Sequence, residues 1–124
     1  MKIEVSNGEL ADKVSILSIK LMKIAAKDKL RNIQKEYDLL YKDMRRIGVT
    51  PDDSRFKSLA SVNSQLWDIE DRIRLKEVDK EFDDEFIDLA RQVYHLNDKR
   101  AEIKREINLS TGSMIIEEKE YVKY

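Results

Sequence analysis

Residues that interrupt helices are scarce in this chain, and their scarcity constrains the fold more than any other feature. Only three glycines and one proline occur in 124 residues, whereas 40% of the residues are Asp, Glu, Lys or Arg. Helices tolerate Lys, Arg and Glu on their outer faces, while strands disfavour several of these residues. Apolar residues recur at helical spacing nearly throughout, which excludes a disordered chain. The sequence therefore predicts an all-α fold.

The first helix is predicted to begin after Ser6, because Ser6 and Glu9 have the spacing of a capping box. Its apolar residues recur at alternating steps of four and three and form one seam. The members of this seam are Leu10, Val14, Leu17, Leu21 and Ile24.

A second seam begins at Leu30, and its phase differs from that of the first. The step from Ile24 to Leu30 is six residues, where the repeat requires seven. We therefore expect a break at Ala26–Asp28, with Asp28 capping a second helix. One continuous helix of about 40 residues with a local adjustment is the alternative.

The segment Gly48–Pro51 is the clearest boundary between elements. Gly48 suits a helix C-terminus, Thr50 an N-cap and Pro51 the first position of a third helix. Asp83 is the expected cap of a fourth helix, which Gly112 ends.

Together these elements predict one domain, residues 1–124, built as an antiparallel bundle of four helices. The bundle has three helices if the first two are continuous. With four antiparallel helices both chain ends emerge at the same end of the bundle. This geometry allows Ile3–Val5 to pair with the tail Met114–Tyr121 as a small sheet.

Composition excludes several classes of protein. The chain has no cysteine, so disulfides and zinc–thiolate sites are excluded. The N-terminus lacks the apolar stretch of a signal peptide, and no apolar run reaches the roughly 20 residues of a membrane helix. We expect a cytoplasmic protein that binds neither membranes nor nucleic acid, because the net charge is only -1.

The charge is nevertheless unevenly distributed along the chain. Residues 1–50 carry 11 basic and 7 acidic side chains, whereas residues 51–90 carry 6 basic and 12 acidic ones. The two regions could attract each other within one chain or between two copies. Two solvated faces are the alternative interpretation.

Signals for catalysis are weak. The single histidine, His95, has no cysteine partner and no nearby serine motif. No Glu-x-x-His pair and no glycine-rich phosphate loop occur, and Asp83-Asp84-Glu85 fits the first turn of a helix, where negative charge is favourable. We expect no catalytic residues, no metal site and no cofactor.

Arg100 is the most informative polar residue, because it occupies a seam position flanked by apolar residues. A buried guanidinium requires a carboxylate or an anionic ligand, and Glu70 is the candidate carboxylate. If the first and fourth helices are neighbours, a polar groove suited to an anion forms between them. Its candidate binding residues are Lys13, Lys20, Trp67, Glu70, Asn97 and Arg100. A buried Arg–Glu bridge beside a solvated lysine stripe is the alternative.

The first helix has apolar residues on more than one face. Ile16 and Ile19 lie outside its main seam. Such a helix is either central in its fold or covered by a partner, and no helix is expected to be central in a four-helix bundle. The sequence therefore predicts a homodimer through Ile16 and Ile19.

Three segments resemble the signature of a family of small, uncharacterised helical proteins of bacteria and their phages. They are Asn7-Gly8-Glu9-Leu10-x-Asp12-Lys13-x-x-Ile16-Leu17-x-Ile19-Lys20, Leu66-Trp67-Asp68-Ile69-Glu70-Asp71 and Asn97-Asp98-x-Arg100-Ala101-x-x-Lys104-Arg105-Glu106-Ile107-Asn108. The similarity extends to Glu117-Glu118-Lys119 and Tyr121. The resemblance implies a setting close to glycosyltransferase and surface-polysaccharide genes, but no activity.

Two hypotheses about function follow. The first is a non-enzymatic interaction or accessory protein with an unknown protein partner, which the resemblance links to polysaccharide biosynthesis. The alternative is a bundle that binds or converts a small anion, such as a nucleotide-sugar, at a polar site between the first, third and fourth helices. A role in binding nucleic acid ranks third, because Trp67 has no aromatic and basic neighbours that would form a stacking platform.

Overall fold

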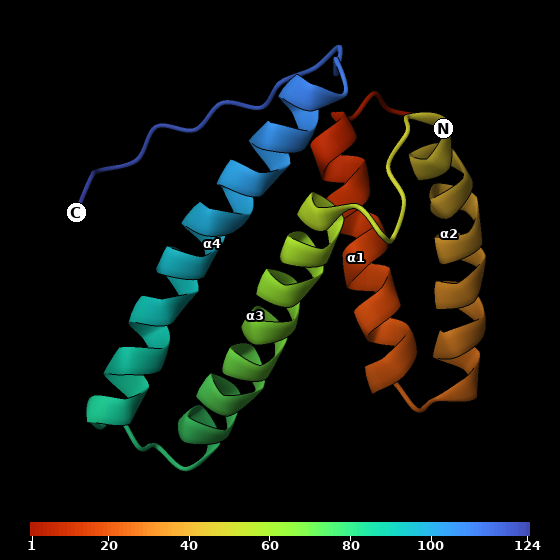
Figure 1. The fold of residues 1–124 in the computed structure, drawn as a ribbon. Helices are drawn as coiled ribbons and strands as arrows, with labels where there is room; N and C mark the ends of the chain where they lie inside the picture. Colours follow the sequence, from red (N-terminus) through yellow and green to blue (C-terminus); the bar gives the residue numbers. More distant parts are fainter.

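The computed structural model describes all 124 residues and consists of four α-helices and no strands (Figure 1). The helices are α1 (Asn7–Lys23), α2 (Lys27–Arg46), α3 (Ser54–Val78) and α4 (Asp84–Ser110). Successive helices run in opposite directions, as the ribbon shows. The predicted all-α antiparallel arrangement of four helices is therefore confirmed.

The predicted break between the first two helices is also confirmed, but its cap differs. α1 ends at Lys23 and α2 begins at Lys27, with Ala26 as an N-cap that makes no side-chain hydrogen bond. Asp28 lies instead within the first turn of α2, where its charge complements the helix dipole. At the other end of α1, Ser6 is the N-cap and its Oγ accepts a hydrogen bond from the Glu9 amide at 3.1 Å.

The start of α3 lies three residues later than predicted. Asp53 is the N-cap: its Oδ1 accepts from the Arg55 amide at 2.8 Å, and the Arg55 side chain bonds the same carboxylate. Thr50 and Pro51 therefore lie in the turn that precedes α3. The Asp53 carboxylate, which also binds the Arg55 side chain, takes the capping role that was predicted for the Thr50 hydroxyl. Asp83 caps α4 as predicted, accepting from the Phe86 amide at 3.0 Å.

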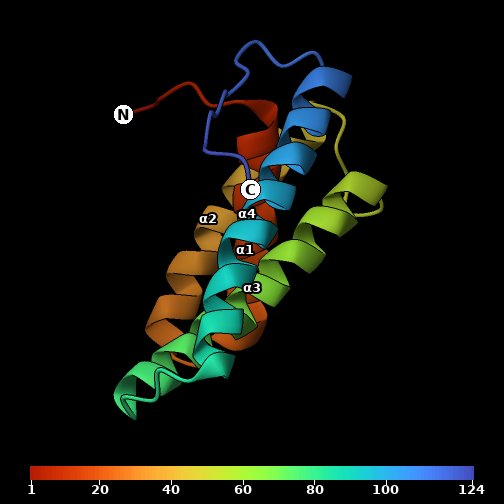
Figure 2. The ribbon, with the colours of Figure 1, turned by 90° about the vertical axis from the view of Figure 1, so that its left-hand side faces the viewer.

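The first helix is central, which differs from the expectation that no helix would be. α1 packs against α2 on one side and against α3 and α4 on the other, while α2 packs against α1 alone (Figures 1 and 2). Eight residues of α1 are buried, and they cover more than half of its circumference; the side that carries Lys13 is exposed. The main core cluster joins α1, α3 and α4 to the C-terminal end of α2, where Met44 is fully buried.

α3 and α4 are longer than α1, and their joined ends extend past it. We call residues 68–91, at the α3–α4 turn, the distal hairpin; it lies at the bottom of Figure 1. Ile69 and Leu89 are buried there. The large apolar side chains beyond them are mostly exposed: Leu75, Val78, Phe82 and Ile87.

The two chain ends approach each other without forming the small sheet that the sequence allowed. Ile3 and Val5 are exposed, and no backbone hydrogen bond joins them to the tail. Instead Ser6 contacts the Glu117 carboxylate, and the tail then runs back beside α4 (Figures 1 and 2). The tail follows α4 because its side chains bond those of that helix. None of the four helices has the length and apolar character needed to cross a membrane.

Candidate functional site

An ion pair between α1 and α4 lies at the centre of the polar interior. The Asp12 side chain is 1% exposed and that of Arg100 is 28% exposed. Arg100 donates to both carboxylate oxygens of Asp12, at 2.9 Å from Nε to Oδ1, with a second bond from Nη2 to Oδ2. This two-pronged contact raises the pKa of Arg100 above its ordinary value, against the opposing effect of burial. Arg100 therefore has its carboxylate within the chain.

Three further side chains complete the hydrogen bonding around this pair. Asn63 of α3 donates through Nδ2 to Asp12 Oδ1 at 2.9 Å and to Ser15 Oγ at 2.8 Å. Ser15 in turn donates to the backbone carbonyl of Asp12 at 2.7 Å, and Asn97 Oδ1 accepts from Arg100 Nη1 at 3.4 Å. No buried side-chain nitrogen or oxygen lacks a partner. A closed network of this kind fixes the positions of three helices.

Similar contacts continue along α1 and α4 toward the chain ends. The Gly8 amide donates to Asn108 Oδ1 at 2.6 Å, and Lys104 pairs with Glu9. Together with Asp12–Arg100 they make three pairs. Their α1 members, Gly8, Glu9 and Asp12, follow one another in the sequence, while their α4 members, Asn108, Lys104 and Arg100, come four residues earlier each time. We call the three pairs the polar ladder. An antiparallel ladder of specific side chains sets the register of the two helices.

The tightest approach in the ladder is at Gly8. A Cβ atom on this residue would lie 2.3 Å from the backbone carbonyl oxygen of Lys104, closer than real Cβ contacts allow. Gly8 is therefore required by contact between two backbones rather than by its own conformational freedom.

A cleft of about 500 Å³ opens beside the buried ion pair. One wall is apolar and comes from Ile16 and Ile19 of α1 with Leu66 and Trp67 of α3. The polar part consists of Asn63, Glu70, Asp71, Arg74, Asn97 and Arg100. The cleft therefore lies between α1, α3 and α4, where the sequence placed the polar site.

Four of the six predicted binding residues line this cleft: Trp67, Glu70, Asn97 and Arg100. Lys13 and Lys20 do not; Lys13 is exposed and lies 3.8 Å from Glu9. The predicted partner of Arg100 was wrong, because Glu70 faces solvent and lies 3.8 Å from Arg74. Asp12 takes its place, since it is buried on the helix that packs directly against α4.

Ile16 and Ile19, which were predicted to lie at a dimer interface, are instead covered at least in part by residues of the same chain. Ile19 is 2% exposed and Ile16 is half-buried, and both line the cleft. They lie off the main seam because α1 is central and has a second face packed against α3 and α4. The argument for a dimer through Ile19 therefore does not hold, and the oligomeric state stays a prediction.

Sequence reasoning missed Asp12, Ser15 and Asn63. A signal for the first two exists in the sequence, because Gly8, Asp12, Ser15 and Ile19 follow one another at steps of four, three and four. This is the spacing of a second buried stripe, but its polar members concealed it. Asn63 offers no comparable signal, since an asparagine beside an apolar seam is ordinarily solvated.

The polar ladder joins six motif residues of the segments Asn7–Lys20 and Asn97–Asn108, which are Gly8, Glu9, Asp12, Arg100, Lys104 and Asn108. The sequence model of one protein family matches residues 1–123; it is described as a family of unknown function, DUF6165. The chain belongs to this family. No activity is assigned to the family by that description. Comparisons with curated proteins and with solved structures found no match.

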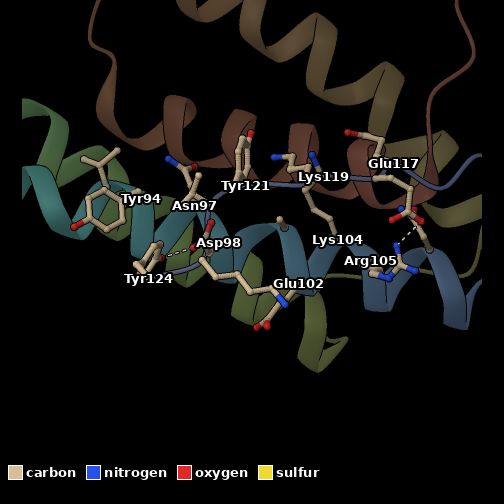
Figure 3. A pocket seen from close by; sticks show the side chains of 16 residues that line it. Tyr94, Asn97, Asp98, Glu102, Lys104, Arg105, Glu117, Lys119, Tyr121 and Tyr124 are labelled. Carbon is tan, nitrogen blue, oxygen red and sulfur yellow. Dashed lines mark hydrogen bonds and ion pairs between the residues drawn. The ribbon is translucent and has the colours of Figure 1, made fainter.

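A second and larger space, of about 1,070 Å³, lies between α4 and the tail of this family member. Figure 3 shows the tail residues Glu117, Lys119, Tyr121 and Tyr124 beside α4. The tail is held at separate points: Arg105 pairs with Glu118 at 2.7 Å, and the Tyr124 hydroxyl donates to Asp98. The bond to Asp98 raises the pKa of Tyr124 to about 12. Between these points the tail does not pack closely against the helix.

The remaining candidate chemistry is dispersed. His95 is exposed, and its ring centroid lies 4.8 Å from those of Tyr94 and Tyr124, which are themselves 5.1 Å apart, so the three rings form one cluster. No three side chains of His, Asp or Glu converge as they would around a metal ion. The buried network and the cleft beside it thus form the main candidate site.

Proposed function

We propose that this chain is a non-enzymatic interaction protein of the cytoplasm, an accessory factor that docks on a protein partner through the distal hairpin. The exposed apolar side chains at the hairpin are the observation that carries this proposal. The setting in surface-polysaccharide synthesis that the resemblance implies belongs to the same proposal.

The state of Arg100 supports an interaction protein over an enzyme. Its guanidinium is bound by Asp12, Asn97 accepts from it, and the surrounding polar atoms all have partners. A group engaged in this way holds helices together and is not free to clamp a substrate. Chemistry on an anion would require this bridge to open, which costs several kcal/mol for a buried carboxylate.

The surface of the distal hairpin supports the choice of docking site. Val78 is 76% exposed and Phe82 is 55% exposed, and they belong to a group of four large apolar side chains near one turn. Phe82 stacks only against Phe86, in an edge-to-face pair at 5.2 Å. Contiguous exposed apolar side chains rimmed by charges are typical of protein interaction sites.

The test compares a hairpin variant with a matched control in native extract. Val78→Ser with Phe82→Ser removes apolar surface at the hairpin, and Leu109→Ser with Met114→Ser removes exposed apolar surface elsewhere. We expect the tagged wild type and the control to capture the same protein and the hairpin variant to lose it. Equal capture by both variants, with unchanged circular dichroism, would exclude the hairpin as the docking site.

A second function is supported by the cleft itself. A cavity of about 500 Å³ lined by Trp67, Arg74 and Arg100 has the size and mixed lining of a small-molecule site. An anion such as a nucleotide-sugar would contact Arg74, whose side chain is 78% exposed. In this case a uridine diphosphate sugar raises the melting temperature of the wild type, and Arg74→Met abolishes the rise. No rise at millimolar ligand contradicts this second function.

A further inference from the structure

We infer that the distal hairpin of one copy docks on α2 of a second copy, and the reverse, so that two chains form a two-fold symmetric pair. The inference rests on the proposed function, because it names the partner of the distal hairpin. The observation behind it is that one chain has two surfaces of opposite charge. Each of these surfaces has an exposed leucine between two charged side chains.

The charges of the two surfaces are equal and opposite. The distal hairpin, residues 68–91, carries ten acidic and five basic side chains. The end of α1 with α2, residues 20–46, carries nine basic and four acidic ones. The uneven charge of the sequence is therefore concentrated on two separate parts of the fold.

Within one chain these two surfaces hardly interact. α2 packs against α1 and not against α3 or α4, and one ion pair joins the two regions, between Lys23 and Asp68 at 3.6 Å. In Figure 1 α2 and the distal hairpin lie on opposite sides of α1. Attraction within the chain thus leaves most of both charges unneutralised.

A matching patch of three side chains lies on each surface. The acidic patch on α3 consists of Leu75, 65% exposed, with Asp71 one turn before it and Asp79 one turn after it. Neither aspartate makes an ion pair. Residues four apart on a helix share a face, so the three side chains form one stripe.

The basic patch on α2 repeats this pattern with the opposite sign. Leu39 is 64% exposed, with Lys35 one turn before it and Lys42 one turn after it. Neither lysine makes an ion pair, whereas Arg31 and Arg46 on the same face pair with aspartates of their own helix. Each patch thus has an exposed leucine between two unpaired charges of one sign.

Each chain carries both patches, so the same contact can form twice in one pair of chains. The pair closes only about a two-fold axis, whereas the same contact without that axis would build an open chain. When α3 of one copy lies on α2 of the other, a two-fold axis brings the second acidic patch onto the first chain's basic patch. Each contact buries two leucines and places two aspartates against two lysines. Contact between two distal hairpins would instead place acid against acid and is disfavoured.

Charge reversal in two separate variants tests this pairing by sedimentation of the full chain. The acid-reversed variant is Asp71→Lys with Asp79→Lys, and the base-reversed variant is Lys35→Glu with Lys42→Glu. We expect the wild type to dimerise at micromolar concentration and each variant alone to dissociate at least tenfold more readily. An equimolar mixture of the two variants restores the dimer, because each contact then joins opposite charges again.

A third variant controls for net charge. Lys57→Glu with Lys99→Glu changes the net charge as much as the base-reversed variant does, at exposed lysines outside both patches. It should dimerise like the wild type, and 0.5 M sodium chloride should weaken the dimers that form.

Several results would overturn the inference. The inference fails if the wild type stays monomeric at 100 µM or if the charge-reversed variants dimerise as readily as the wild type. It also fails if the two variants fold into helices but stay monomeric when mixed. Growth of the wild type into higher oligomers, in place of a closed dimer, would exclude the two-fold pair. A monomeric wild type whose distal hairpin still captures another protein overturns this inference but leaves the proposed function standing. Capture that persists in the variant with Val78→Ser and Phe82→Ser refutes the proposed docking site independently.

Discussion

The polar ladder between α1 and α4 and the ionic contacts of the distal hairpin use the same kinds of residue in opposite surroundings. In the ladder, Asp12 is buried and receives hydrogen bonds from two other helices. In the distal hairpin, Lys76 contacts three carboxylates, but those carboxylates are each about half exposed. Water competes more strongly with the second set of contacts than with the first. We therefore expect burial, rather than the number of ion pairs, to decide which of the two sets of contacts stabilises the fold more.

The largest expected difference between the two ends comes from breaking the ladder at its centre. Arg100→Met leaves the buried Asp12 carboxylate without its cation and should lower the free energy of unfolding by about 3–5 kcal/mol. Adding Asp12→Asn should restore most of the loss, because the neutral amide keeps an acceptor for Asn63. Urea unfolding of the single and double variants measures both effects.

The matched control lies in the distal hairpin. Arg72 pairs there with Glu85, and both side chains are exposed. Arg72→Met should change the unfolding midpoint far less than Arg100→Met does. If the two single variants are equally stable, burial does not distinguish the two ends of the molecule.

A smaller loss of stability is expected from a substitution at Gly8, where α1 and α4 pack backbone against backbone. Alanine ordinarily favours a helix over glycine, but at Gly8 its Cβ meets the Lys104 carbonyl. We expect Gly8→Ala to destabilise the fold by about 1–3 kcal/mol, because two backbones must separate. A thermal melt at or above the wild-type midpoint would show that α1 and α4 can slide apart without cost.

The smallest expected effect is a loss of the ion pairs of the distal hairpin at acid pH. Hydrogen bonding by Lys76 lowers the pKa of Asp83, and Arg72 and Lys76 lower that of Glu85. A carboxylate whose pKa is lowered by folding stabilises the fold fully at a pH above its ordinary pKa, which is 3.8 for Asp83. This stabilisation is lost as the pH falls through the lowered pKa of the folded state. The turn at 79–83 should therefore loosen below about pH 4.

Carboxyl chemical shifts followed by NMR check this expectation. In the wild type Asp83 should titrate below 3.8, and Lys76→Met should return its midpoint toward that value. An Asp83 that titrates at its ordinary pKa in the wild type contradicts the proposed coupling to Lys76.

The sequence predicted the helices better than it predicted what surrounds them. The break near Ala26 could be read from a change of phase in the apolar seam, which depends on local spacing alone. The partner of Arg100 could not, because the choice between Asp12 and Glu70 depends on which helix is central. That α1 is central follows from α2 packing on α1 alone, which is a property of the assembled fold.

The candidate site was predicted in part for the same reason. Trp67 and Asn97 flank apolar seams and Arg100 occupies a seam position, so their location between helices could be anticipated. Lys13 was misplaced because the face of α1 that carries it points to solvent. The cap at Asp53 was missed since Thr50 and Pro51 form an equally good local pattern, and only the contact with Arg55 distinguishes them.

The separation of α2 from α3 and α4 also has a consequence for the order in which the chain folds. Each of the two helical hairpins, α1–α2 and α3–α4, is made of contacts between neighbours in sequence, which form early and fast. The ladder instead joins residues about 90 to 100 positions apart, such as Asp12 with Arg100 and Gly8 with Asn108. We therefore expect two preformed hairpins to meet in a late step, and mutations in the ladder to accelerate unfolding while leaving the folding rate nearly unchanged.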